Sequence, residues 1–76
     1  MAKKEKGGAA VYRVTEVIGT SKNSWEDAAR NAVKVASSTL RDLRIAEISK
    51  LDVKIDEKGK ISQFRARLAL SFKYDV

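Results

Sequence analysis

The segment from Phe64 to Tyr74 alternates between two kinds of side chain, and this alternation constrains the fold more than any other feature of the sequence. Every second position is apolar: Phe64, Ala66, Leu68, Leu70, Phe72 and Tyr74. The positions between them are mostly polar: Arg65, Arg67, Ala69, Ser71 and Lys73. Because successive side chains of a β-strand point to opposite faces, the pattern predicts a long strand with one apolar face and one mostly polar face.

A tight turn joins this strand to the one before it. Residues 56–59, with the sequence Asp-Glu-Lys-Gly, lie between Ile55 and Ile61. Gly59 can take the left-handed backbone conformation that a bulged hairpin turn requires. The two strands are therefore expected to pair as an antiparallel hairpin.

The earlier strand of the hairpin changes phase in its middle. Ala46 and Ile48 are apolar at even positions, whereas the apolar positions that follow are odd: Leu51, Val53 and Ile55. A one-residue change of phase moves the apolar side chains to the other face of a strand. We therefore predict a β-bulge near Ser49 and Lys50 that resets the register.

A helix is predicted to begin after Ser24 and to run to about Arg41. The hydroxyl of Ser24 can cap the first turn, and Asp27, three positions on, can reach back to it in a capping box. Apolar residues then recur at steps of three and four: Trp25, Ala28, Ala29, Ala32, Val33, Ala36, Leu40 and Leu43. The opposite face carries Arg30, Lys34 and Ser38. Because so many of the apolar residues are alanines, we expect the helix to lie close to a sheet.

A first strand precedes the helix and completes a β-α-β-β order of elements. Residues 11–18 are rich in β-branched and aromatic side chains, which favour a strand, and residues 19–23 are interpreted as a loop. The expected fold class is α+β, with a three-stranded antiparallel sheet wrapped around one helix. Residues 1–10 combine three lysines with two glycines and are expected to form a flexible basic tail, and residues 11–76 a single domain.

Composition excludes most enzyme mechanisms. The chain has 76 residues, 43% of them hydrophobic, and contains neither cysteine nor histidine. Disulfides, zinc ligation, thiol nucleophiles and imidazole acid–base catalysis are therefore absent, and we expect no enzymatic activity. No apolar stretch approaches the roughly 20 residues of a membrane span, and no secretory signal is visible, so a cytoplasmic protein is expected.

The lengths of the predicted elements favour an oligomer. Strands of about 12 residues span roughly 40 Å, whereas a helix of about 17 residues spans only about 25 Å. The hairpin must then extend beyond its own helix and expose apolar side chains and strand edges, which monomers avoid. A chain of this size also has a small core, and association is the usual remedy.

Five short segments, in this order, resemble the dodecin family. They are Val17 to Ser21, Ser24 to Ala29, Thr39 to Arg41, Leu43 to Glu47 and Leu70 to Tyr74. The resemblance covers about residues 11–74 and implies a hollow homododecameric shell that binds a small ligand. The resemblance also implies a ligand site of the kind that binds flavin (riboflavin or FMN) in some dodecins. In that site, between subunits, the flavin ring stacks on a tryptophan and is hydrogen-bonded by a glutamine.

The residues at these flavin positions differ in this chain. Alignment on the family pattern puts Ile45 where the tryptophan belongs and Arg65 where the glutamine belongs, with Glu47 and Arg67 nearby in the same site. Flavin binding is accordingly expected to be weakened, and Arg65 could pair instead with a phosphate or carboxylate. Trp25 lies too far along the chain to replace the missing ring and is expected in the core or at a subunit contact.

Two other ligands are considered. The resemblance extends to dodecins associated with calcium, and the available oxygen donors are Glu16, Glu47, Asp52, Asp56 and Glu57. No single loop supplies the six to eight oxygens that calcium prefers, so several subunits would have to contribute. The simpler interpretation is that these carboxylates are solvated or form surface ion pairs.

The net charge of +6 suggests nucleic-acid binding as an alternative function, but no basic stripe with interleaved aromatic residues supports it.

Overall fold

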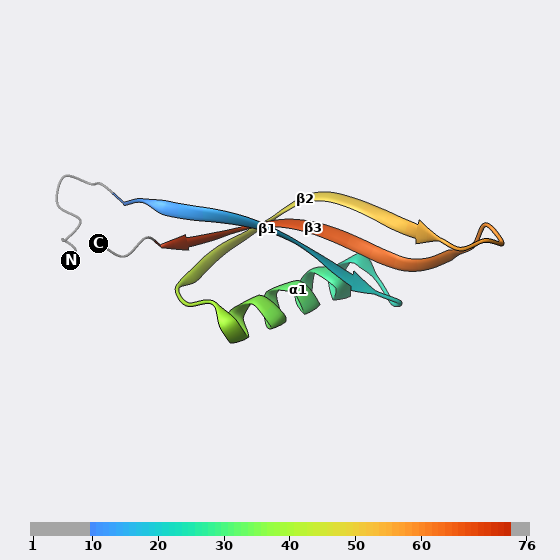
Figure 1. The fold of residues 1–76 in the computed structure, drawn as a ribbon, viewed down its shortest axis with the longest axis horizontal. Coiled ribbons are helices and arrows are strands. Elements are labelled where there is room, and N and C mark those ends of the chain that lie inside the picture. The colour runs from blue at the N-terminus through green and yellow to red at the C-terminus, as the bar shows by residue number, and fades with distance from the viewer. Residues whose placement is uncertain (1–9, 74–76) are drawn as a thin grey trace.

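The computed structural model describes residues 10–73 and has the predicted β-α-β-β order (Figure 1). The elements are β1 (Tyr12–Ser21), α1 (Trp25–Thr39), β2 (Leu43–Ile55) and β3 (Ile61–Lys73). The strands form one antiparallel sheet in the order β1-β3-β2. The predicted tail, apart from residue 10, and the predicted strand position Tyr74 lie outside the described residues.

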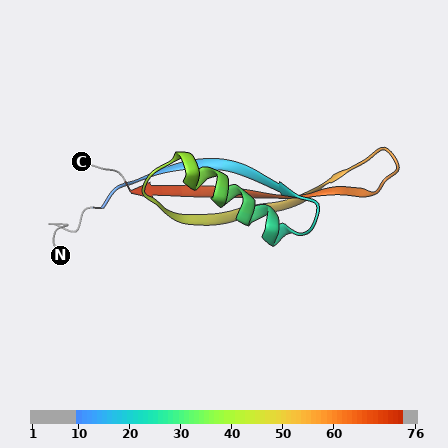
Figure 2. The same cartoon turned by 90° about the horizontal axis from the view of Figure 1, so that it is seen from below.

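Helix α1 lies obliquely across one face of the sheet (Figure 2). Its buried residues are Ala28, Ala32 and Ala36, and they pack against a row of buried side chains on β3. That row consists of Ala66, Leu68, Leu70 and Phe72. The expected close approach of an alanine-rich helix to the sheet is confirmed, as is the apolar face of the last strand.

Gly19 shows how close the approach is. It is buried and lies under the first turns of α1, where an added Cβ would collide with the carbonyl oxygen of Ala28 and lie 2.8 Å from the Cβ of Ala32. Cβ atoms do not approach other atoms to such distances, so glycine is required here by space, not by backbone conformation.

The first strand is longer than the sequence indicated. The prediction of a loop over residues 19–23 was wrong for its first three residues, because Gly19, Thr20 and Ser21 pair with Ala66, Arg65 and Phe64 of β3. Glycine is a poor strand former by propensity, and here its contact with the helix outweighs that preference.

The start of α1 is capped as predicted, but one detail differs. Ser24 Oγ accepts a hydrogen bond from the Asp27 amide at 2.9 Å. The expected return bond, in which the Ser24 amide donates to the Asp27 carboxylate, is wrong: the Ser24 amide donates to Ser21 Oγ at 3.4 Å. Ser21 Oγ also accepts from the Asn23 amide and donates to the Asp27 carboxylate at 2.7 Å. The buried hydroxyl of Ser21 thus links the end of β1 to the first turn of the helix.

The helix ends at Thr39, two residues before the predicted end. Hydroxyls of its last three residues bond back to carbonyls of the preceding turn, which competes with continuation of the helix: Ser37, Ser38 and Thr39. Leu40 is the extended cap residue, and Asp42 takes a positive φ of 57°. Leu43, predicted on the helix, begins β2 instead and packs against the core.

Two features predicted for the hairpin, the β-bulge and the glycine turn, are confirmed. The register between β2 and β3 shifts between Ile48 and Lys50, which is the predicted bulge. Gly59 has a φ of 79°, and the Asp56 carboxylate accepts from the amides of Lys58 and Lys60 to close the turn.

The hairpin extends well beyond the helix, as expected from the element lengths (Figure 1). The molecule measures 57 × 20 × 15 Å. Ile55 and Ile61 near the tip are 61% and 56% exposed, although both are large apolar residues. No helix within residues 10–73 has the length and apolar character needed to cross a membrane.

Candidate functional site

The candidate site lies on the face of the sheet that points away from α1, here called the outer face. Leu68 and Leu70 point to the helix, so the residues that alternate with them on β3 point away from it. Cross-strand partners share a face. Ile45 pairs with Ser71 and Glu47 pairs with Ala69, which puts both on the outer face. The four residues predicted for the ligand site therefore share one face: Ile45, Glu47, Arg65 and Arg67.

Apolar side chains on both edge strands, β1 and β2, are left uncovered on the outer face. Val14 pairs with Ser71 and Ile18 pairs with Arg67, so both belong to the outer face with Ile45. All three are about half exposed or more. The outer face is therefore only partly polar, with apolar surface beside its charged residues.

Arg65 is held by a carboxylate of the neighbouring strand. Its Nε and Nη2 donate to the two oxygens of Asp52 at 2.7 and 3.1 Å, a two-point arrangement that suits guanidinium and carboxylate geometry. The hydrogen bond to Asp52 raises the pKa of Arg65, and the hydrogen bond from Arg65 holds the pKa of the Asp52 carboxyl below its ordinary value. The anion-binding fork of Arg65 is thus occupied from within the chain.

Trp25 fixes the backbone beneath this ion pair. Its indole Nε1 donates to the carbonyl oxygen of Asp52 at 2.9 Å, and its ring meets Phe64 edge-on, with centroids 5.2 Å apart. Trp25 does not lie in the core, since it is 40% exposed, so of its two predicted positions only the subunit contact stays a prediction. Its bond to Asp52 leaves no local signal in the sequence, because it depends on how the helix and the hairpin cross in three dimensions.

Arg67 is held much less firmly than Arg65. Its Nη1 makes one contact with Glu16 of β1, at 3.4 Å. On the other side its cross-strand partner is Lys50, and Ser49 Oγ at the bulge donates to the Arg67 carbonyl at 3.2 Å. Sequence reasoning did not single out Lys50. Its pairing with Arg67 depends on the exact register of the hairpin, which also shifts between Lys54 and Ile55.

The candidate calcium donors are not brought together in the described chain. Glu16 and Asp52 form ion pairs with Arg67 and Arg65, and Asp56 closes the hairpin turn. Within residues 10–73 no three acidic side chains lie close enough to hold a metal ion. Glu47 lies near the start of β2, whereas Glu57 lies in the turn after the end of β2. A calcium site on this chain therefore requires oxygens from another subunit.

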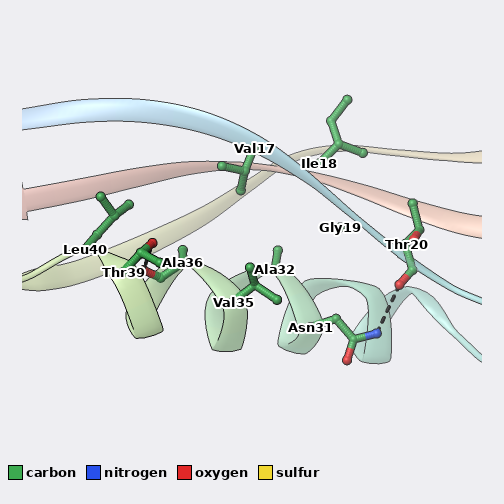
Figure 3. Close-up of a pocket in the computed structure, with 10 residues that line it drawn as sticks. All are labelled: Val17, Ile18, Gly19, Thr20, Asn31, Ala32, Val35, Ala36, Thr39 and Leu40. Atoms are coloured by element: carbon green, nitrogen blue, oxygen red, sulfur yellow. Dashed lines mark hydrogen bonds between the residues drawn. The ribbon is translucent and has the colours of Figure 1, made fainter.

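A hollow of about 410 Å³ lies elsewhere, between β1 and the side of α1 that faces it (Figure 3). Val17, Ala32 and Val35 point into it, and Asn31 Nδ2 closes one end by donating to the Thr20 carbonyl at 3.0 Å. No charged side chain lines it. It therefore lacks the groups that would recognise an anion or a metal ion, and the outer face remains the better candidate.

The lowered pKa values give a testable acid dependence. The hydrogen bond from Ser21 lowers the pKa of Asp27, as that from Arg65 lowers the pKa of Asp52. A carboxyl with a lower pKa in the folded state stabilises the fold above its unfolded pKa, and this contribution is lost as pH falls through the folded value. We expect the free energy of unfolding to fall as the pH drops below about 4. It should fall less in Asp27→Asn and in Asp52→Asn. Denaturant unfolding from pH 6 to pH 2 measures this.

The control for the acid dependence is Glu57→Gln. Glu57 lies at the exposed hairpin turn and has no ion pair among the described residues. Its variant should follow the wild-type stability profile. Identical acid slopes for the wild type and both aspartate variants would contradict the expectation.

The order of elements and the open three-stranded sheet define a class of small α+β proteins whose long hairpin extends past a single helix. A family model described as Dodecin matches residues 11–75, so the chain belongs to the dodecin family. The chain is 44% identical over 64 residues to the protein described as calcium dodecin of Mycobacterium tuberculosis (strain ATCC 25618 / H37Rv). That match spans 84% of this chain and 89% of the relative.

Solved dodecin structures share the fold. Dodecin from Streptomyces coelicolor superposes with a TM-score of 0.80 at 36% identity, covering 100% of this chain and 99% of that chain. The calcium dodecin of Mycobacterium tuberculosis, described as calcium-chelating with a novel calcium-binding site, superposes with a TM-score of 0.75 at 43% identity, covering 86% of this chain and 91% of that chain. The predicted family and fold class are confirmed.

Proposed function

We propose that the chain assembles into a hollow homododecameric shell that binds, stores or buffers a small ligand between subunits, as a binding protein of the cytoplasm and not an enzyme. The observation that supports assembly best is the exposure of large apolar side chains around a core that consists of three alanines of α1 and four residues of β3. Monomers rarely leave so much apolar surface in water. Membership of the dodecin family supports the number of subunits.

The ligand site is proposed on the outer face, around Ile45, Glu47, Arg65 and Arg67. Ile45 lacks the ring on which a flavin would stack, a loss of roughly 0.5–1.5 kcal/mol beyond the area buried. Arg65 is already bound to both oxygens of Asp52. Both features weigh against flavin recognition of the usual dodecin type.

Calcium is the second candidate ligand, because a 44% identical relative is described as a calcium dodecin. Glu16 and Glu47 lie on the outer face on either side of the small residue Ala69. Two carboxylates fall short of the oxygen ligands calcium takes, so a facing subunit would have to supply the others. A shell without any ligand is the remaining alternative.

Native mass spectrometry tests the proposal, because it reports subunit number and bound mass together. We expect a twelve-subunit species for the purified protein, little added mass with riboflavin phosphate, and no loss of the shell when flavin is absent. Calcium addition with and without a chelator tests the second ligand. A monomer or dimer under native conditions would contradict the shell, and a stoichiometric flavin complex would restore the ordinary dodecin site.

A further inference from the structure

The β-bulge determines which face of the sheet Lys50 occupies. Ile48, before the bulge, lies on the helix side beside Leu68, with which it pairs. In a regular strand Lys50, two residues later, would lie on that same side. The bulge adds one residue, and Lys50 instead pairs with Arg67 on the outer face. A bulge is known to redirect side chains next to functional sites.

The resulting pair places two positive charges directly opposite each other. Like charges in this position destabilise a sheet. Neighbouring carboxylates compensate the pair only in part: Glu16 contacts Arg67 once, at 3.4 Å, and Asp52 attracts Arg67 electrostatically but is hydrogen-bonded to Arg65. Lys50 has no ion pair within the part of the chain that the structure describes.

The contrast with Arg65 shows which guanidinium is available to a ligand. Arg65 is two residues away on the same face and donates at 2.7 and 3.1 Å to both oxygens of Asp52. An incoming anion would have to displace that carboxylate. Among residues 10–73, Arg67 makes one side-chain hydrogen bond, so most of its five donors are available to a ligand.

We propose that Lys50 and Arg67 form a binding site for the phosphate group of a small ligand. A phosphate monoester carries nearly two negative charges at neutral pH and so neutralises both cations at once. The arginine fork binds two of its oxygens and the lysine a third. Ile18, which pairs with Arg67 on its other side, offers exposed apolar surface to the rest of the ligand. This inference rests on the proposed ligand-binding role of the outer face and names the ligand class.

Binding of inorganic phosphate to the assembled protein tests the pair directly. Isothermal titration calorimetry at constant ionic strength should show binding to the wild type, and at least about tenfold weaker binding to Lys50→Gln and to Arg67→Gln. Lys54→Gln is the matched control, because Lys54 lies further along the same face of β2 and pairs with the neutral Gln63. Equal phosphate affinity in all four proteins, or none in the wild type, overturns the inference. Citrate in parallel distinguishes phosphate from carboxylate recognition, and tighter binding of citrate than of phosphate also overturns it.

A charge reversal gives a second, independent readout. Lys50→Glu turns the repulsive pair into an attractive one, so its melting temperature without phosphate should exceed that of the wild type, and phosphate should no longer raise it. Lys54→Glu makes the same change in net charge and should show neither effect. If both reversals shift the melting temperature equally, Lys50 is an ordinary solvated charge and the inference is wrong.

Native mass spectrometry of the same samples separates this inference from the proposed function. A dodecamer that does not bind phosphate overturns the Lys50–Arg67 site and leaves the shell in place. Phosphate binding that depends on Lys50 and Arg67 in a smaller species supports the site and overturns the shell.

Discussion

Replacing Gly19 by alanine is expected to destabilise the protein by about 3 kcal/mol or more, which is the upper part of the range for overpacked cores. The added Cβ would collide with the Ala28 carbonyl oxygen and come within 2.8 Å of the Ala32 Cβ. The carbonyl oxygen belongs to the helix backbone and the Cβ to the short side chain of Ala32, so no flexible group can move aside. Denaturant unfolding at a fixed protein concentration measures the loss, since assembly makes apparent stability depend on concentration.

Gly59→Ala is the matched control for that experiment. Gly59 has a φ of 79°, and an added Cβ would meet nothing within 4 Å. Its cost is therefore only the conformational penalty of a left-handed non-glycine residue, about 1–2 kcal/mol. A Gly19→Ala variant that is as stable as Gly59→Ala would show that α1 does not lie on β1 as described.

Leu70→Ala is expected to cost about 2–5 kcal/mol, the usual range for removal of a buried leucine side chain. Leu70 is 0% exposed and lies on β3, the central strand of the sheet, in the core beneath the helix. The surrounding alanines are too short to collapse into the space it would leave, which favours the upper half of the range. Chemical denaturation measures the loss.

Ile61→Ala removes a side chain of similar size from the same strand and serves as the comparison. Ile61 is 56% exposed in the single chain, so its truncation should cost clearly less than that of Leu70. A loss for Ile61 as large as that for Leu70 would contradict this expectation and would indicate that another subunit covers the hairpin tip in the assembly.

Much of the fold could be predicted from periodicity alone. The strict alternation after Phe64 identified β3, the alanine spacing identified α1, and the phase change after Ile48 located the bulge. These features could be predicted because each reflects which side of an element is buried, and burial leaves a repeating pattern of apolar residues in the sequence.

The ends of the elements and the contacts of the site were harder to predict. β1 continues through Gly19 because a helix packs on it, and α1 ends early because hydroxyls bond back to its last turn. The Arg65–Asp52 ion pair joins residues 13 apart and depends on the exact register of the hairpin. Neither long-range contact nor register is encoded in local propensity.

The fluorescence of Trp25 reports on the junction between the helix and the hairpin. It is the single tryptophan of the chain, and it touches the helix start, the Asp52 carbonyl of β2 and the Phe64 ring of β3. Its emission therefore comes from one place, the junction at which the extending hairpin leaves the helix. Any event that moves the hairpin relative to the helix, including docking of a second subunit, changes the surroundings of that single fluorophore without the need for a label.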